Sequence, residues 1–427
     1  MSALQYETKE KLYSRLAELE KVYQGYKQRG LKLDMSRGKP EPEQLDLTMG
    51  LLDCVNLREG YRTKDGFDTR NYGLFDGIPE MKEIFSGFFE VDESQVIVGG
   101  NSSLNLMFDF ISMAYSKGIL GNPPWSRQKG VKFLCPSPGY DRHFKITEYF
   151  GIEMITVNMT AEGPDMEQVE KYAADPLVKG IWCVPIYSNP DGITYSAKTV
   201  RRLAALKAAA PDFCIMWDMA YYLHHLEEPG DTLLNLYRES EANGTENRVV
   251  MFASTSKISF PGAGVAAMAA SPDVIADVRR RLSVQTIGYD KINMLRHVRF
   301  FGSYQNMCKH MKLHAAIIRP KFKAVLDTLE KNLAGKGIAE WNRPRGGYFI
   351  SVNLLDGCAK ETVRLLKEAG VEMTPAGATY PYGNDPRDRN IRIAPTFPPI
   401  SELQVSMELF CVCAEIACIK KMISEAW

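Results

Sequence analysis

The sequence predicts an α/β fold with a mostly parallel central sheet, followed by a smaller α+β domain. Short apolar runs alternate with helical patterns between residues 95 and 270, as in strands joined by crossover helices. Polar or aromatic residues follow several of these runs directly, at the strand ends where such sheets bind ligands. Beyond residue 272 the pattern becomes mainly helical, with two further strand-like runs.

The N-terminal region precedes this alternation. Residues 3–29 are predicted to form an amphipathic helix, because apolar side chains from Leu12 to Tyr23 recur at spacings of three and four. Loops rich in proline or glycine cover residues 33–42 and 71–79, and a helical pattern covers residues 80–89.

The remaining predicted elements divide at about residue 272. The predicted strands of the main sheet are residues 95–98, 131–135, 151–157, 181–185, 213–217, 249–252 and 264–270, with helices near 104–111 and 197–210. After them we expect a helical segment at 273–333, strands at 346–352 and 390–394, and helices at 358–369 and 401–424. We therefore expect an N-terminal helix and loop (1–50) packing with the small domain, a large domain (51–300) and a small C-terminal domain (301–427).

Composition limits the classes of function. The 427 residues carry 52 Lys+Arg and 52 Asp+Glu, so there is no overall charge to attract nucleic acid or anionic lipid. The nine cysteines are odd in number, widely spread and free of CxxC pairs, which favours a reducing compartment. The polar N-terminus is no signal peptide, and no apolar run is long enough to span a membrane. We expect a cytoplasmic protein without a nucleic-acid or membrane partner.

The stretch from Ala253 to Val265 organises the chain. Lys257 lies there among hydroxyl residues, after a predicted strand and before a Pro/Gly turn. A buried lysine can lose its proton and attack an aldehyde to form a Schiff base, while Ser254 and Ser256 could hold a phosphate beside it. These properties favour pyridoxal phosphate (PLP) as cofactor. A surface lysine in a polar loop remains the alternative for this stretch alone.

Four other strand ends supply groups that PLP chemistry needs. Asp218 could keep the pyridine nitrogen protonated, or could cap a following helix. Asn101 and the adjacent Ser102 open a helix whose N–H groups could receive a phosphate, or could act as a simple cap. Tyr140 could stack on the ring or lie in the core, and Asn189 could donate to the ring hydroxyl or serve a turn.

These motifs carry a family resemblance. Asn189-Pro-Asp-Gly, Asp218-Met-Ala-Tyr, Ser254-Thr-Ser-Lys and Asn390-Ile-Arg-Ile occur in the order and rough spacing of fold-type I PLP-dependent aminotransferases. The segments SRGKP, NYGLFDG, STSKISFPGAG and DKINMLRHVRFF resemble a narrower bacterial group, the type Ic aspartate aminotransferases, often confused with MocR-type regulators. The resemblance covers nearly the whole chain and implies the three-layer PLP-transferase fold.

The resemblance implies a role at each matching position. Lys257 would hold the cofactor as an aldimine and shuttle the substrate Cα proton, and Asp218 would pair with the pyridinium nitrogen. The phenolic oxygen would be bound by Tyr221 and Asn189, the ring would stack on Tyr140, and the phosphate would be bound by Asn101, Ser102, Ser254 and Ser256. Tyr72 would reach the phosphate of a neighbouring subunit, which makes a homodimer the functional unit.

Substrate recognition follows less directly. Arg392 would grip the substrate α-carboxylate with two hydrogen bonds. For a second carboxylate, Arg37 and Lys39 are candidate cations beside the backbone of Gly38, although a solvated charged loop is an equal alternative. Aspartate or glutamate with 2-oxoglutarate is the implied substrate pair, and other aromatic or neutral amino acids remain an alternative.

Two departures from the family pattern stand out. The usual phosphate-binding arginine about eight positions after the lysine is absent, because residues 262–265 read Gly-Ala-Gly-Val. Backbone N–H groups, hydroxyls or a distant residue such as Arg296 would have to replace it. The segment leading to Tyr140 (PSPGY) also looks one residue short.

Rival interpretations have weaker support. Ser254 to Lys257 also spells S-x-x-K, as in penicillin-binding proteins, but no Lys-Thr-Gly occurs and the order of motifs is wrong. Residues 262–267 match a dinucleotide-binding G-x-G-x-x-A without the acid it needs. His224 and His225 lack a third ligand, so no metal is expected. A non-catalytic PLP-binding regulator stays open, although no basic DNA-binding segment is present.

Overall fold

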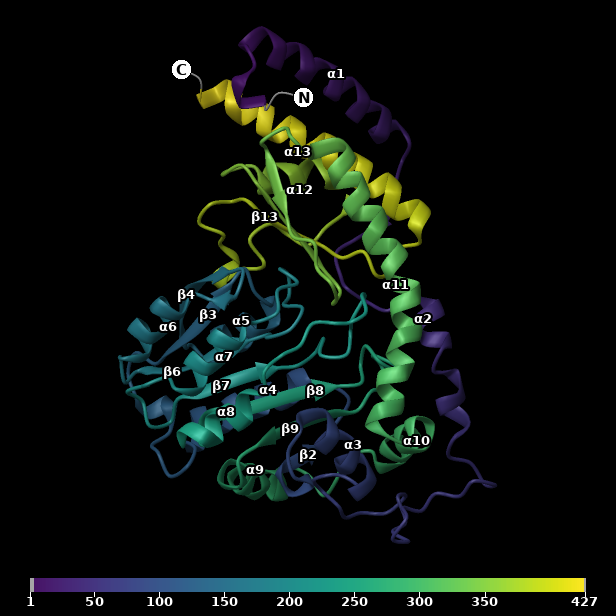
Figure 1. The fold of residues 1–427 in the computed structure, drawn as a ribbon, viewed down its shortest axis with the longest axis vertical. Coiled ribbons are helices and arrows are strands. Elements are labelled where there is room, and N and C mark those ends of the chain that lie inside the picture. The colour runs from purple at the N-terminus through teal and green to yellow at the C-terminus, as the bar shows by residue number, and fades with distance from the viewer. Residues whose placement is uncertain (1–3, 426–427) are drawn as a thin grey trace.

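The protein's structure, a computed structural model, describes residues 4–425. An eight-stranded sheet of order β2-β9-β8-β7-β6-β3-β4-β5 forms the centre of its larger part (Figure 1). The strands from β8 to β4 run parallel, whereas β9 pairs antiparallel with β8 and β2, and β5 pairs antiparallel with β4. The predicted mostly parallel sheet is confirmed, with antiparallel pairing near both edges. Its strands are β2 (Val96–Val98), β3 (Lys132–Ser137), β4 (Glu153–Thr160), β5 (Gly163–Pro164), β6 (Val178–Cys183), β7 (Cys214–Asp218), β8 (Val249–Ser254) and β9 (Ala266–Ala270).

Helices cover both faces of this sheet, which gives three layers. Successive side chains of a strand point to opposite faces. Along β8, Val249 and Met251 therefore pack into one apolar core, whereas Val250 and Phe252 pack into the other. The helices of this part are α3 (Pro79–Phe89), α4 (Ser103–Lys117), α5 (Asp141–Tyr149), α6 (Met166–Ala173), α7 (Ala197–Ala204), α8 (Leu236–Asn243), α9 (Pro272–Gln285) and α10 (Lys291–Phe301).

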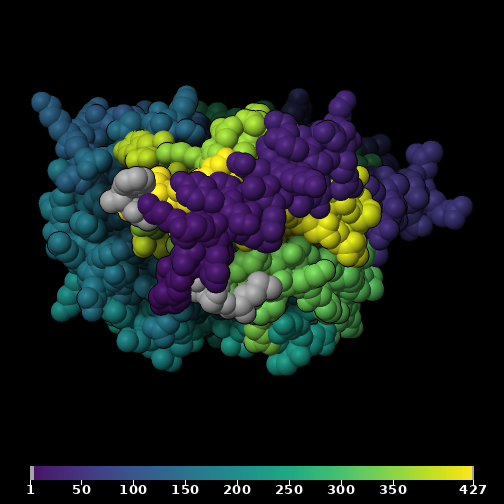
Figure 2. Space-filling view, turned by 90° about the horizontal axis from the view of Figure 1, so that it is seen from above, coloured from purple at the N-terminus to yellow at the C-terminus, as the bar shows by residue number. Residues whose placement is uncertain are grey.

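A second core forms around a small antiparallel sheet of order β10-β11-β13. The long helix α11 runs along one side of the molecule, from α10 to α13, and β9 lies at the opposite end of the molecule from α13 (Figure 1). Helix α1 packs against α13 (Figures 1 and 2). The remaining elements are α1 (Lys9–Gln28), β1 (Leu33–Asp34), α2 (Pro42–Asp46), α11 (Tyr304–Leu333), β10 (Ala339–Trp341), β11 (Ile350–Leu354), α12 (Ala359–Glu368), β12 (Val371–Glu372), β13 (Asn390–Ile393) and α13 (Ile400–Glu425).

Some predicted boundaries were wrong. The first helix begins at Lys9 rather than residue 3, because Thr8 caps it by accepting from the Lys11 N–H; residue 3 itself lies outside the described part. The helical segment at 273–333 is three helices, separated by the turns at 286–290 and 302–303. The helix from Ala197 ends at Ala204 instead of residue 210.

Candidate active site

The five predicted strand-end residues lie beyond one edge of the large sheet. Asn101, Tyr140, Asn189 and Lys257 follow β2, β3, β6 and β8, and Asp218 is the last residue of β7. These five strands share one direction, because β2 pairs antiparallel with β9, which in turn pairs antiparallel with β8. The sheet therefore delivers all five residues to its carboxyl edge, where open α/β sheets bind ligands.

Lys257 lies in a turn directly after β8. Its Nζ atom is 5.0 Å from the centroid of the Tyr221 ring. Loss of hydration lowers the pKa of the Lys257 amine below 10.5, and the negative charge of Asp218 partly opposes this effect. The amine thus has the lowered pKa that a nucleophilic lysine requires.

Helix α10 holds the turn that carries Lys257. The Nδ2 group of Asn293 donates to the carbonyls of Ala263 and Gly264 at 2.9 and 3.1 Å. Nε2 of His297 lies 3.1 Å from the Thr255 hydroxyl and 2.8 Å from the Ser259 hydroxyl. The segment DKINMLRHVRFF therefore fixes the lysine turn from behind.

Asp218 is buried and held on both oxygens. Its Oδ1 accepts from the N–H of Ala220 at 3.1 Å, and its Oδ2 lies 3.1 Å from Nε2 of His143. The ring of His143 stacks on Trp182, with centroids 4.4 Å apart. Asp218 is not a helix cap, because no helix follows β7 directly.

Small donors gather between Lys257 and the start of α4. The Ser254 hydroxyl donates to the Ser256 hydroxyl at 3.1 Å, and the Ser256 hydroxyl donates to the carbonyl of Asn101 at 3.0 Å. Ser102 occupies the N-cap position of the 15-residue α4, but its side chain makes no capping hydrogen bond. The first N–H groups of α4 consequently keep their capacity to bind an anion. Hydroxyls beside a helix N-terminus fit a phosphate group.

Arg392 on β13 reaches this edge from the small sheet. Its Nη1 donates to Oδ1 of Asn189 at 3.1 Å and to Asp141 at 3.2 Å, and its guanidinium lies 4.8 Å from the Phe349 ring centroid. Its buried Nε has no hydrogen-bond partner among residues 4–425. An unsatisfied, buried N–H of this kind suits a carboxylate ligand.

The predicted substrate loop approaches the same place. A Cβ atom added to Gly38 would lie 2.7 Å from the Phe349 ring, so a larger residue there would have to displace that ring. Lys39 is exposed, with its Nζ 4.2 Å from the centroid of the Phe397 ring, and Arg37 is also exposed. Gly38 therefore lies beside the aromatic ring that supports Arg392, whereas the two cations face solvent.

The other predicted residues divide between the site and the surface. Tyr140 lies near Asp218 and Arg392, whose charges act on it, and burial raises its pKa to about 12. Burial also raises the pKa of Tyr221 well above 10. Tyr72 is 76% exposed. Arg296 lies on α10, and its buried Nε has no hydrogen-bond partner within the described residues.

Sequence reasoning missed the residues that support these side chains. They are His143, Asn293, His297 and Asp141. The sequence held a signal for two of them, because His297 lies within DKINMLRHVRFF and His143 lies three residues after Tyr140.

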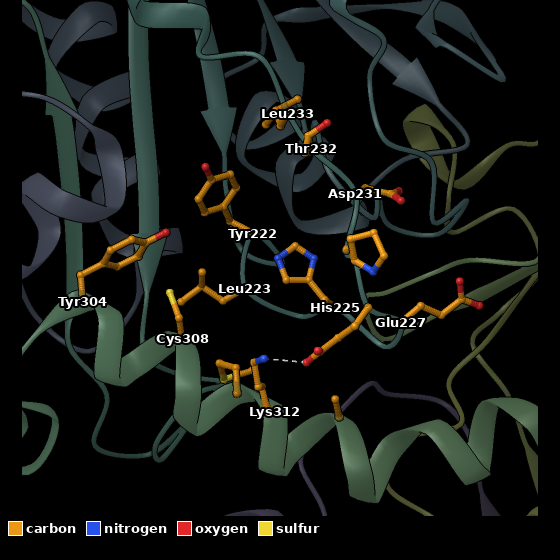
Figure 3. Close-up of a pocket in the computed structure, with 15 residues that line it drawn as sticks. Tyr222, Leu223, His225, Glu227, Asp231, Thr232, Leu233, Tyr304, Cys308 and Lys312 are labelled. Carbon is orange, nitrogen blue, oxygen red and sulfur yellow. Dashed lines mark ion pairs between the residues drawn. The ribbon is translucent and has the colours of Figure 1, made fainter.

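Other features of the described residues carry no such chemistry. A hollow of about 470 Å³ lies between α11 and residues 222–233, lined by Tyr222, His225 and Tyr304, and Figure 3 shows it with the ion pair of Lys312 and Glu228. None of the predicted site residues lines it. Residues 4–425 contain no group of three side chains placed to bind a metal, and none of their helices is long and apolar enough to cross a membrane.

Comparisons with known proteins agree with this arrangement. A sequence profile of the aspartate amino-transferase family matches residues 7–426. The aspartate aminotransferase of Corynebacterium glutamicum is 43% identical over 404 residues, 94% of this chain and 93% of that protein. The crystal structure of an aspartate transaminase from C. glutamicum is 41% identical and superimposes with a TM-score of 0.96, covering 98% of this chain and 99% of that one.

A more distant structure shares the fold. The α-aminoadipate aminotransferase of Thermus thermophilus, complexed with N-(5'-phosphopyridoxyl)-L-leucine, has a TM-score of 0.73 at 18% identity, over 93% of this chain and 95% of that one. The close matches span almost the full length of both partners, and they share the sheet whose carboxyl edge gathers Lys257, Asp218 and Arg392. The chain therefore belongs to the aspartate aminotransferase family, and it is a fold-type I transaminase.

Proposed function

We propose that the protein moves an amino group between an acidic amino acid, aspartate or glutamate, and a 2-oxo acid such as 2-oxoglutarate, with PLP held on Lys257. The observation that carries the proposal is the largely buried amine of Lys257. Burial lowers the pKa of this amine, and the negative charge of Asp218 partly opposes that effect. When bound, PLP supplies an electron-withdrawing ring that stabilises charge at the substrate Cα.

The residues around Lys257 fit this cofactor. Ser254, Ser256 and the uncapped start of α4 would hold its phosphate together with Asn101 and Ser102. Asp218, kept in place by His143, would hold the proton on the ring nitrogen. Tyr140 would lie against the ring, and the hydroxyl of Tyr221 would bind its phenolic oxygen.

Each remaining group has a task at the substrate. The Nδ2 of Asn189 is directed by Arg392, which occupies Oδ1, so Nδ2 would donate to the phenolic oxygen of the cofactor. Arg392 would bind the α-carboxylate through the Nε and Nη atoms. Nζ of Lys257, once released, would take the proton from the substrate Cα and later return it. Lys39 or Arg37 would attract the second carboxylate beside Gly38.

A homodimer is part of this proposal. Tyr72 is too exposed to serve its own site without a covering partner, and Leu57 in the same N-terminal region is fully exposed. Tyr72 would donate to the phosphate bound by a second copy of the chain. A Tyr72→Phe variant should lose cofactor affinity without losing Lys257 reactivity.

The test is an absorbance titration of the purified holoenzyme with a panel of amino acids. Aspartate and glutamate should abolish the visible band of the lysine-bound cofactor, whereas aromatic and neutral amino acids should leave it. Lys257→Ala should remove the band. Lys336→Met is a matched control, because Lys336 is also buried. Its ion-pair partner Glu415 would still form an ion pair with Arg15 in this variant. A band that persists in Lys257→Ala would refute the assignment.

A further inference from the structure

Lys291, the first residue of α10, is a deeply buried lysine without a carboxylate partner. Residues 4–425 contain four lysines that are at most 7% exposed, and three of them form ion pairs. These three pairs are Lys179 with Asp212 at 2.8 Å, Lys321 with Glu41 at 2.7 Å and Lys336 with Glu415 at 2.6 Å. Lys291 is 5% exposed and forms no ion pair within the described residues, and its Nζ donates to the carbonyl of Tyr289 at 3.3 Å.

The surroundings of Lys291 disfavour its positive charge. A buried ammonium group without a counter-ion is costly, and the helix dipole disfavours a cation in the first turn of α10. The adjacent Asp290 is engaged elsewhere, because it caps α10 by accepting from the N–H of Asn293 at 2.9 Å. Burial lowers the pKa of Lys291 below 10.5, and the charge of Asp290 opposes this effect only in part. An anion bound beside Nζ would remove the imbalance.

The Nζ atom of Lys291 lies beside the loop that carries Tyr72. A Cβ atom built on Gly288 would lie 2.7 Å from this Nζ and 2.9 Å from the carbonyl oxygen of Gly73. Tyr72 and Ile287 each precede one of these two glycines in the chain, and they are 76% and 64% exposed. Lys291 therefore belongs to a surface region whose large side chains are uncovered in the single chain.

The proposed phosphate cradle has the opposite deficiency. It consists of hydroxyls, an amide and the N–H groups at the start of α4, all of them neutral. A phosphate group carries about two negative charges at neutral pH. Residues 262–265, where the family usually places an arginine, hold no charged side chain. The cradle thus lacks a cation, whereas Lys291 lacks an anion.

We propose that Lys291 supplies the positive charge for the cofactor phosphate held by the other subunit of the dimer, next to Tyr72. This inference rests on the proposed function, which places Tyr72 of one subunit at the phosphate of the other. Lys291 and the Tyr72 loop then form one phosphate-binding group, which dimerisation brings to the cradle. The missing arginine is replaced by a cation from a different chain.

The first test compares two forms of the cofactor on the apoprotein. Pyridoxal lacks the phosphate, so the ratio of the dissociation constants for pyridoxal and PLP isolates the phosphate contacts. Lys291→Met should weaken PLP binding about 10- to 100-fold, the effect of one charge-assisted hydrogen bond, and should change pyridoxal binding less than about twofold. Lys291→Arg should keep most of the affinity for PLP. The control Lys336→Met should bind both compounds as wild type does.

Unfolding of the apoprotein gives a readout without the cofactor. Because Lys291 has no counter-ion, Lys291→Met should unfold in phosphate-free buffer at the same urea concentration as wild type or at a higher one. Lys336→Met should unfold at a lower concentration, because it breaks a buried ion pair. A loss of stability in Lys291→Met as large as that in Lys336→Met would overturn the description of Lys291 as a charge without a partner.

Mixed dimers identify the subunit that Lys291 serves. A subunit with Lys291→Met is combined with one that carries Lys257→Ala, so the visible band reports only the site that keeps Lys257. That site receives an intact Lys291 from the other chain and should bind PLP as tightly as wild type. Action within one chain is the alternative, because Asn293, two residues after Lys291, donates to the carbonyl of Gly264 at 3.1 Å. The mixed dimer would then bind as weakly as the Lys291→Met dimer, which would overturn the proposal.

Kinetic constants separate the cofactor phosphate from the second carboxylate of the substrate. A KM for aspartate that rises in Lys291→Met while PLP affinity stays at the wild-type value would assign Lys291 to that carboxylate and overturn the phosphate assignment. An unchanged ratio of pyridoxal to PLP affinity in Lys291→Met would overturn it as well. A wild-type protein whose cofactor band does not depend on Lys257, or which stays monomeric with PLP bound, would instead refute the proposed function.

Discussion

Asp218 offers the sharpest test of the site, because a second buried aspartate lies near the other end of the same strand. Asp218→Asn keeps the shape of the side chain and removes its charge. The N–H of Ala220 can still donate to the remaining carbonyl oxygen, but the new NH₂ group faces Nε2 of His143, 3.1 Å away in the wild type. The substitution thus removes the charge opposite Lys257 with little change in packing.

The expected loss follows from burial. Removing one preorganised group that stabilises charge in the transition state costs about 3–4 kcal/mol, and each 1.4 kcal/mol is about tenfold in rate. Because the bond from Ala220 survives, the lower part of that range applies, and kcat/KM should fall about 10²- to 10³-fold. The midpoint of unfolding in urea should change much less than this loss in activity implies.

Asp212→Asn is the control. Asp212 is as buried as Asp218, and it accepts from Lys179 and from the indole of Trp125, both at 2.8 Å. Its substitution should destabilise the fold by about 3 kcal/mol and leave kcat within about twofold of wild type. Steady-state transamination and urea unfolding measure both variants. Equal losses of kcat in the two, or full activity in Asp218→Asn, would show that Asp218 is only a structural carboxylate.

Three further predictions concern Arg392, Gly38 and stability at acid pH. Arg392→Lys should raise KM for dicarboxylates about 10- to 100-fold in steady-state kinetics, because lysine cannot form the paired hydrogen bonds of a guanidinium; an unchanged KM would contradict the assignment. Gly38→Ala should raise KM similarly while unfolding stays near wild type, since its Cβ would displace the Phe349 ring. Burial lowers the pKa of His297 to about 4, so the stability gained from its neutral form is complete above about pH 6.5 and lost as pH falls towards 4. Urea unfolding should give a lower free energy of unfolding at pH 5 than at pH 7.5, and this difference should be smaller in His297→Gln.

The residues of the candidate site could be predicted from the sequence because the ends of apolar strands can be recognised there. Asp218 and Lys257 directly follow apolar runs, and parallel strands bring such positions to one edge. The pairing of β9 with both β2 and β8 was not predictable, since it depends on which strands meet in space. The partners of the reactive residues were missed for the same reason. His143 lies 75 residues before Asp218 in the chain, and no periodicity connects them.

Three of the six histidines contact the candidate site residues or the turn that carries Lys257, and their chemistry explains why. His143 contacts Asp218, His224 contacts the Lys257 carbonyl, and His297 contacts the hydroxyls beside it. Burial lowers the pKa of His224, His225, His297, His310 and His314, so these rings are neutral at physiological pH. A neutral imidazole can donate at one nitrogen and accept at the other without adding charge. A lysine or arginine in the same places would repel the ammonium form of Lys257, and a carboxylate would raise the pKa of its amine. Neutral rings can therefore fix the turn and leave the charge balance of the amine to Asp218 alone.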